Sequence, residues 1–279
     1  MPQIILGPGL EKIDGSLQKA TYAFLAKLAH DDTVPGLHIE PINNSADTRA
    51  RTGRVDLSNR AVLFKLQGSQ KDASYLFIGT FPHDEAISIA QKSRVNINPR
   101  NGVAELIPVD NPDPPIASIA AYEPSTGVAP TAADDEPSLR ARNYTADDFI
   151  SLGFDATYAD GALDLVGADA LLEYAATAPA TWQGSALLDL YTGESFSAVR
   201  DKYQLGEPAS TDSTDDDTLL RALRHPAAQM EFAFIEDDDE LRAAIENPDF
   251  VAWRIFLHPE QRAYTTRDYN GAFRLTGGD

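Results

Sequence analysis

The sequence predicts an α+β fold in which an antiparallel sheet with two N-terminal helices is followed by a mainly helical module. Three observations lead to this prediction. Short β-type runs dominate residues 1–109, apolar residues recur at helical spacing in residues 143–205, and a proline-rich stretch separates the two parts. Strands grouped before helices are typical of α+β proteins, whereas strands and helices alternate regularly in the α/β class.

The first part begins with a short apolar strand and two helical segments. In the second of these, Leu17, Phe24 and Leu28 lie on one face, as in an amphipathic helix. The run at 75–81 is almost continuously apolar, which indicates a strand buried on both faces. In order, we expect a strand at 3–6, helices at 10–14 and 16–29, extended runs at 37–42, 52–57, 61–66 and 75–81, and a helix from Pro82 through Lys92.

A hairpin is predicted to complete this part. Residues 94–98 and 103–109 are β-type runs that flank Pro99-Arg100-Asn101-Gly102. Asn-Gly between two such runs is a strong hairpin signal, because a type I′ turn needs positive φ at both central positions. We therefore expect the hairpin to extend the first domain to residue 109.

The rest of the chain divides by composition. Prolines in residues 110–142 resist both helix and sheet, so this stretch is predicted to be a linker. Thr145 with Asp148 forms a candidate capping pair, and Asp215-Asp216-Asp217 is expected to be solvated charge at a helix N-terminus. The predicted segments are a first domain at 1–109, a linker at 110–142, a helical module at 143–205, an acidic linker at 206–217 and a final segment at 218–279.

One pair of helices in the module, at 181–191 and 195–203, is separated by a glycine and has the spacing of a DNA-reading helix-turn-helix. Its second helix offers Arg200 and Lys202, which Glu194 and Asp201 balance. We therefore favour a helical hairpin that serves packing over one that reads DNA.

Composition limits the classes of function. The chain has no cysteine, which excludes disulfides and thiolate sites, and its five histidines have no metal-ligand spacing, so no metal site is expected. No apolar run approaches the length of a membrane span, and we expect a cytoplasmic protein. The net charge of −20 is uneven, since residues 1–108 hold 12 basic and 11 acidic side chains. A site for nucleic acid is therefore expected in the first third.

Several motifs of residues 1–93 resemble the RelE/ParE toxin superfamily. These are the run Gly-Leu-His-Ile-Glu-Pro-Ile at 36–42, the arginines Arg49, Arg51 and Arg54, Arg60 at the start of the next strand, and Phe-Pro-His-Asp-Glu-Ala at 81–86. The resemblance implies a RelE-like antiparallel sheet whose basic residues position RNA. The residues expected to bind nucleic acid are Arg49, Arg51, Arg54, Arg60 and Lys65.

An active ribonuclease also needs proton carriers, and the candidates are His38 and His83, with Arg51 as a further catalytic candidate. After the last strand only His83 stands near the catalytic position of the toxins, and it is followed by Asp84 and Glu85, whose charge repels phosphate. An inactive fold used for binding is therefore the favoured interpretation, and no catalytic residue is assigned.

The last two dozen residues resemble the entry to the motor of a UvrD/Rep-type superfamily 1 DNA helicase. The resemblance rests on Phe-Leu-His-Pro-Glu-Gln at 256–261 and on Asp-Tyr-Asn-Gly-Ala-Phe-Arg-Leu-Thr-Gly-Gly at 268–278. It implies that residues 218–279 form the start of the motor, that Gln261 recognises adenine, and that Gly277 and Gly278 begin the phosphate loop. No Lys-Ser/Thr follows these glycines, so this nucleotide site is incomplete, and ATP and Mg²⁺ are implied only for a full-length helicase.

The two resemblances together predict a non-catalytic N-terminal region of a UvrD-like ATP-dependent DNA helicase, which regulates the enzyme or recognises DNA or RNA. Its partners would be nucleic acid and the rest of the motor. Two alternatives remain open. One is a RelE-like toxin ribonuclease that acts on mRNA, and the other is an acidic module that binds a protein partner.

Overall fold

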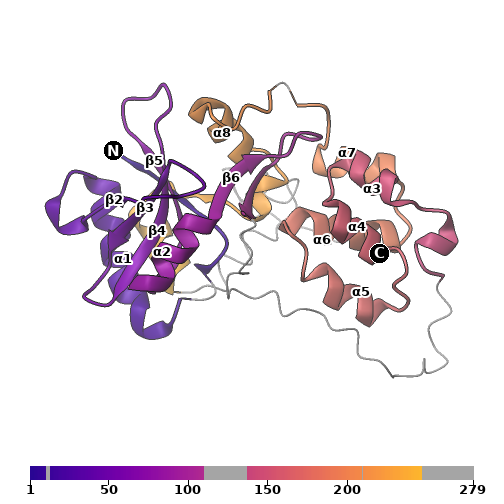
Figure 1. Cartoon of the computed structure of the whole chain (residues 1–279), viewed down its shortest axis with the longest axis horizontal. Helices are drawn as coiled ribbons and strands as arrows, with labels where there is room; N and C mark the ends of the chain where they lie inside the picture. The colour runs from indigo at the N-terminus through magenta and orange to yellow at the C-terminus, as the bar shows by residue number, and fades with distance from the viewer. Residues whose placement is uncertain (11–12, 110–136, 209, 247–279) are drawn as a thin grey trace, which may run out of the picture.

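The computed structural model describes residues 1–10, 13–109, 137–208 and 210–246. In this part of the chain the fold is mixed α and β, with a mostly antiparallel six-stranded sheet and a separate two-stranded hairpin. Figure 1 shows the sheet on one side of the molecule, a group of helices on the other, and the hairpin between them. The predicted α+β class is confirmed at this level.

The large sheet has the strand order β2-β3-β4-β5-β1-β8. β1 runs parallel to β5, and the other neighbours are antiparallel. The strands β1, β4 and β5 cover the predicted runs, whereas β3 begins before the run predicted at 52–57 and ends at Arg54. The bounds are β1 Gln3–Leu6, β2 Glu40–Pro41, β3 Ala50–Arg54, β4 Asn59–Leu66, β5 Ser74–Pro82 and β8 Ala233–Phe234.

Helices cover both faces of this sheet. α1 (Gly15–His30) packs on one face together with α9 (Asp238–Glu246), and α2 (His83–Lys92) packs on the other. The side chains of β4 alternate accordingly. Leu63 belongs to the apolar cluster under α1, whereas Val62 belongs to the cluster under α2.

Of the two helices expected in the N-terminal part, α1 is confirmed, whereas the helix expected at 10–14 includes residues 11 and 12, which lie outside the described residues. One detail differs from the prediction. The extended run expected at 37–42 is reduced to β2, because Pro35–Leu37 forms a 3-10 turn and His38 follows it with φ of 42°. A left-handed residue cannot continue a strand.

The hairpin comprises β6 (Ser93–Ile97) and β7 (Ala104–Pro108). It forms as predicted, but its turn is not type I′. Only Gly102 has a positive φ, of 76°, and its N–H donates to the Asn98 carbonyl across a longer turn. The side chains of Asn98 and Asn101 accept hydrogen bonds within the turn and donate to the Gly153 and Leu152 carbonyls, so they tie the turn to the helical part.

The helical part contains five α-helices among the described residues. Thr145 and Asp148 form the predicted capping box, and Gly153 ends the first helix with φ of 98°. The bounds are α3 Ala146–Leu152, α4 Ala156–Ala162, α5 Ala168–Ala175, α6 Thr181–Tyr191 and α7 Phe196–Tyr203, with 3-10 turns at Arg140–Arg142 and Ala228–Met230.

The sheet part and the helical part share one apolar core. A single cluster contains Val62 of β4, Phe149 of α3, Trp182 of α6 and Phe232. Polar contacts reinforce it, since Trp182 Nε1 donates to Glu105 Oε1 at 3.1 Å. The hairpin therefore fixes the helical part against the sheet.

The chain then returns to the sheet. α8 (Asp216–Leu223) leads to β8, which pairs with β1, and to α9, which packs on α1. Asp215 caps α8 and Asp216 and Asp217 lie in its first turn, as predicted, and the latter two also accept hydrogen bonds from the backbone N–H groups of Gln67 and Ser69. Residues 218–246, which we expected to begin the motor, therefore complete the N-terminal sheet. No helix of the described residues is long and apolar enough to cross a membrane.

The packing of α1 on the sheet leads to a first prediction, at Gly53. A Cβ at this position would lie 2.3 Å from Cζ of the buried Phe24 ring. We expect Gly53→Ala to lower the free energy of unfolding by about 1–3 kcal/mol, because an over-packed core must shift. Urea unfolding measures this. Gly36→Ala is the control, since a Cβ there meets nothing within 4 Å, and equal stability of both variants would contradict the packing argument.

A second prediction concerns Glu231, beside the junction of the two parts. Burial, together with the charge of Glu105, raises the pKa of this carboxyl to about 8. The folded chain therefore holds a proton that the unfolded chain releases near pH 4.5, so this group lowers stability as the pH rises from about 4.5 to 8. The titration of this one group changes the free energy of unfolding by at most about 1.4 kcal/mol per pH unit.

We expect Glu231→Gln to raise the urea midpoint at pH 8 and to leave it nearly unchanged at pH 5. The exposed Glu236 provides the matched control variant, Glu236→Gln. If the urea midpoints of wild type and Glu231→Gln change with pH in the same way, the fold does not keep this carboxyl protonated.

Candidate nucleic-acid interface

A pocket of about 300 Å³ lies where β3 and β4 meet the first turn of α2. It collects basic and imidazole side chains from three segments of the first domain. Four of its residues, His38, Arg54, Arg60 and His83, are candidates from the sequence. Its lining among the described residues is His38, Glu40, Pro41, Ile42, Thr52, Arg54, Arg60, His83 and Ile87.

The two arginines reach the pocket because of strand register. Arg54 at the end of β3 stands directly opposite Arg60 at the start of β4. Residues opposite each other point to the same face, so both guanidinium groups lie on the side of the sheet that α2 covers. Like charges in this position repel each other and destabilise a sheet.

Neither arginine forms a salt bridge within the described part of the chain, although Asp56 lies close enough to Arg60 for the two charges to interact. Nη1 of Arg60 donates to the carbonyl oxygens of Asp56 and Asn59, at 3.0 and 3.1 Å, and these bonds hold the side chain in place. Both residues remain partly exposed. The pair is therefore a partly ordered cationic group that is open to an anion.

The two histidines enter the pocket from opposite sides of the sheet's end. His38 follows the 3-10 turn in a left-handed conformation, which directs the chain into β2. His83 is the first residue of α2, and its N–H donates to the Ser58 carbonyl at 3.0 Å, so α2 is tied to the β3–β4 turn. Nδ1 of His83 lies 3.1 Å from Asp84 Oδ1. That contact orients the imidazole.

The predicted single basic face is not formed. Side chains alternate along a strand, and Arg51 is three residues from Arg54, so the two point to opposite faces. Arg51 pairs with Leu63 on the α1 side and donates to the Thr48 and Ala50 carbonyls. The expectation that Arg51 joins the other arginines is therefore wrong.

Lys65 lies on the α1 side as well. Its Nζ is 3.2 Å from Asp32 Oδ2 and 5.4 Å from the centre of the Tyr75 ring. Tyr75 donates to the same carboxylate at 2.7 Å. Burial raises the pKa of Tyr75, as does this hydrogen bond, so the phenol keeps its proton. Lys65 therefore belongs to a structural cluster away from the pocket.

Arg49 is structural too. Its side chain is 14% exposed and bonds to both oxygens of Asp47 at 2.8 Å, to the Val95 and Ser213 carbonyls, and to Asp216 at 3.4 Å. Burial alone lowers the pKa of Arg49, but the two carboxylates outweigh it and raise the pKa. With its donors occupied, Arg49 is not available to a phosphate.

The different surroundings of Arg49 and Arg51 lead to a third prediction. We expect Arg49→Ala to lower the free energy of unfolding by about 3 kcal/mol, because it leaves the buried carboxylate of Asp47 without its partner. Arg51→Ala should change stability by less than about 1 kcal/mol, since its bonds lie at the surface. Urea unfolding of both variants checks this, and similar losses for the two would mean that Arg49 is not a structural anchor.

Sequence reasoning missed two polar residues of the pocket, Glu40 and Thr52. Thr52 is two residues before Arg54, so strand alternation could have placed both on one face. Glu40 pairs with Thr52 across β2 and β3. Its carboxylate reduces the positive charge of the pocket but leaves the two arginines in excess, and it adds a hydrogen-bond acceptor.

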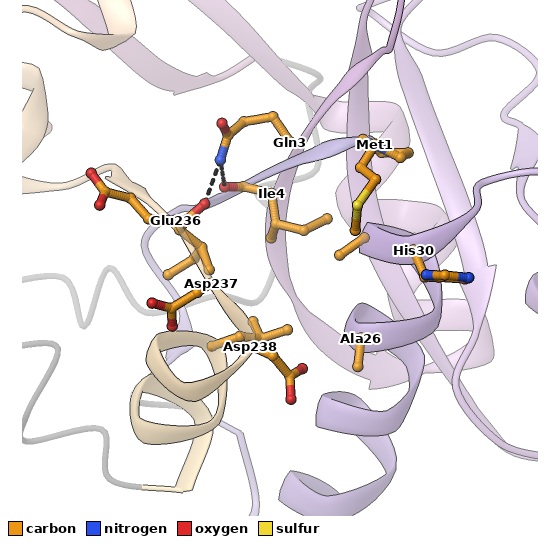
Figure 2. A pocket seen from close by; sticks show the side chains of 12 residues that line it. Met1, Gln3, Ile4, Ala26, His30, Glu236, Asp237 and Asp238 are labelled. Atoms are coloured by element: carbon orange, nitrogen blue, oxygen red, sulfur yellow. Dashed lines mark hydrogen bonds between the residues drawn. The ribbon is translucent and has the colours of Figure 1, made fainter.

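Another pocket, of about 410 Å³, lies between α1, β1 and the start of α9 and is shown in Figure 2. His30 lies on one side of it and Glu236 to Asp238 on the other. These acids serve local structure. Asp237 accepts from the Glu240 N–H at 2.8 Å, and Asp238 accepts from the Tyr22 hydroxyl. With acidic side chains on its rim, this pocket is unsuited to phosphate.

The remaining sequence-predicted site residues, Gln261, Gly277 and Gly278, lie outside the described residues. In the described part, no group of three or more His, Asp or Glu side chains could hold a metal ion. Comparison with known proteins does not extend these findings, because the chain matches no family model, no curated protein and no solved structure.

Proposed function

We propose that the N-terminal part of this chain binds the phosphodiester backbone of a nucleic acid in the pocket of Arg54, Arg60, His38 and His83. The observation that carries this proposal is the cross-strand pair of Arg54 and Arg60, neither of which forms a salt bridge in the described structure. A bound phosphate would lie between the two charges, accept hydrogen bonds from both guanidinium groups and remove their repulsion.

The wider role that we propose is the non-catalytic regulatory and recognition region of a UvrD-like ATP-dependent DNA helicase in the cytoplasm. The support is the sequence resemblance at Gln261, Gly277 and Gly278, with ATP and Mg²⁺ implied only for the full-length enzyme. A RelE-like first domain agrees with the strand order, because β3, β4 and β5 form an antiparallel series and β1 lies parallel beside β5.

A second candidate function is RNA cleavage, and the meeting of His38 and His83 in one pocket favours it. One imidazole would take the proton of a ribose 2′-hydroxyl as its oxygen attacks phosphorus. The other would give a proton to the 5′-oxygen as the P–O5′ bond breaks, leaving a 2′,3′-cyclic phosphate. The two arginines would stabilise the charge that develops on the phosphoryl oxygens.

Binding of single-stranded RNA and DNA 20-mers, measured by fluorescence anisotropy at low salt, tests the first function. We expect Arg54→Ala and Arg60→Ala each to weaken binding about tenfold, in line with the loss of a charged hydrogen bond. Each should also reduce the slope of log K against log salt by about one. Arg51→Ala, on the opposite face, is the matched control and should bind like wild type.

Equal loss in Arg51→Ala would place the nucleic acid elsewhere, and wild-type affinity in both pocket variants would exclude this pocket as the site. Gel analysis of the same RNA tests cleavage. If wild type cleaves the RNA, and His38→Ala and His83→Ala still bind it but no longer cleave it, the chain is a ribonuclease instead. A chain that neither binds nor cleaves would favour the acidic protein-binding module.

A further inference from the structure

A second group of open cations lies at the junction between the hairpin and the helical part, away from the residues of the first pocket. It lines a pocket of about 500 Å³ whose basic residues are Arg100, from the hairpin turn, and Arg200, from α7. The other lining residues are Pro99, Ser151, Leu205, Gly206, Glu207, Pro208 and Thr211.

The turn that carries Arg100 is held firmly. The Arg100 N–H donates to Asn98 Oδ1 at 3.0 Å, and Asn98 Nδ2 donates to the Gly153 carbonyl at 2.7 Å. Asn101 Nδ2 donates to the Leu152 carbonyl at 2.8 Å. Both asparagine side chains are buried. The hairpin turn is therefore fixed to the end of α3.

The opposite wall is fixed as well. The Leu205 N–H donates to the Arg200 carbonyl at 2.8 Å, which ends α7 and begins the loop. Pro208 then packs against Gly102, where an added Cβ would lie 2.8 Å from the proline Cβ. Because these segments are already held together, a ligand would lose little affinity to ordering the pocket.

The chemistry of the lining indicates the ligand. Both arginine side chains are exposed, and in the described residues neither makes an ion pair with an acid. Two free guanidinium groups on one pocket favour an oxyanion, and phosphate matches their planar donors. No aromatic side chain lines the pocket, so a base would find no stacking surface.

The carboxylate of Glu207 indicates the chemical class of the ligand more closely. Its carboxylate lines the same pocket and would repel a second phosphate, but it accepts hydrogen bonds from hydroxyl groups. The volume is also larger than one phosphate requires. We propose that this pocket binds a phosphorylated ribose, with its phosphate on Arg100 and Arg200 and its sugar hydroxyls on Glu207.

This chemistry has two sources, a free ribose phosphate or a ribonucleotide unit within an RNA strand. Isothermal titration calorimetry of the full chain with ribose 5-phosphate, inorganic phosphate and a single-stranded RNA 10-mer distinguishes them. We expect Arg100→Ala and Arg200→Ala each to weaken binding at least about tenfold. Glu207→Gln should reduce the preference for ribose 5-phosphate over inorganic phosphate.

The control is Arg140→Ala, because Arg140 is an exposed arginine of the helical part that already pairs with Asp164 at 2.7 Å. Repeating the titrations in an Arg54→Ala/Arg60→Ala background removes the contribution of the first pocket, and the losses in Arg100→Ala and Arg200→Ala should persist there. If wild type binds ribose 5-phosphate and Arg100→Ala and Arg200→Ala do not, the natural ligand is a free ribose phosphate. If wild type binds only the RNA and both variants lose that binding, the ligand is a ribonucleotide unit of an RNA strand. No binding of any probe, or equal affinity in Arg100→Ala, Arg200→Ala and wild type, overturns the proposal.

Discussion

The buried guanidinium of Arg49 connects three parts of the chain that are distant in sequence. It binds Asp47 before β3, the Val95 carbonyl of β6, and both Ser213 and Asp216 near the start of α8. A buried charge of this kind is stable only while its partners stay in place. The sheet, the hairpin and the returning segment are therefore held in one relative position.

Local sequence patterns predict most of the helices and strands, but they do not predict which distant strands pair with each other. The apolar runs that became β4 and β5 and the capping box at Thr145 carry their signals within a few residues. β8 has only two residues and pairs with β1 through contacts some 230 positions apart in the chain, as Ile5 with Phe234. A strand this short has no periodicity, so only the folded chain shows where it belongs.

The same limit of local sequence patterns applies to the side chains of the candidate site. Strand alternation, applied to the spacing of Arg51 and Arg54, is enough to separate them onto opposite faces. It does not show that Arg49 is buried, because Asp216 comes from a segment that follows the whole helical part. Nor does it bring His38 to His83, whose meeting depends on the 3-10 turn and on the bond between His83 and Ser58.

The overall charge of the chain gives a misleading view of its binding surfaces. With a net charge of −20, the protein repels phosphate at long range, so general electrostatic attraction cannot supply affinity for nucleic acid. Some of its cations are paired with acids in ways that serve folding, as Arg49 and Lys65 are. Arg54 and Arg60 line one pocket and Arg100 and Arg200 another, and none of the four forms a salt bridge within the described part of the chain. Binding at either pocket would therefore depend on short-range hydrogen bonds from the paired guanidinium groups.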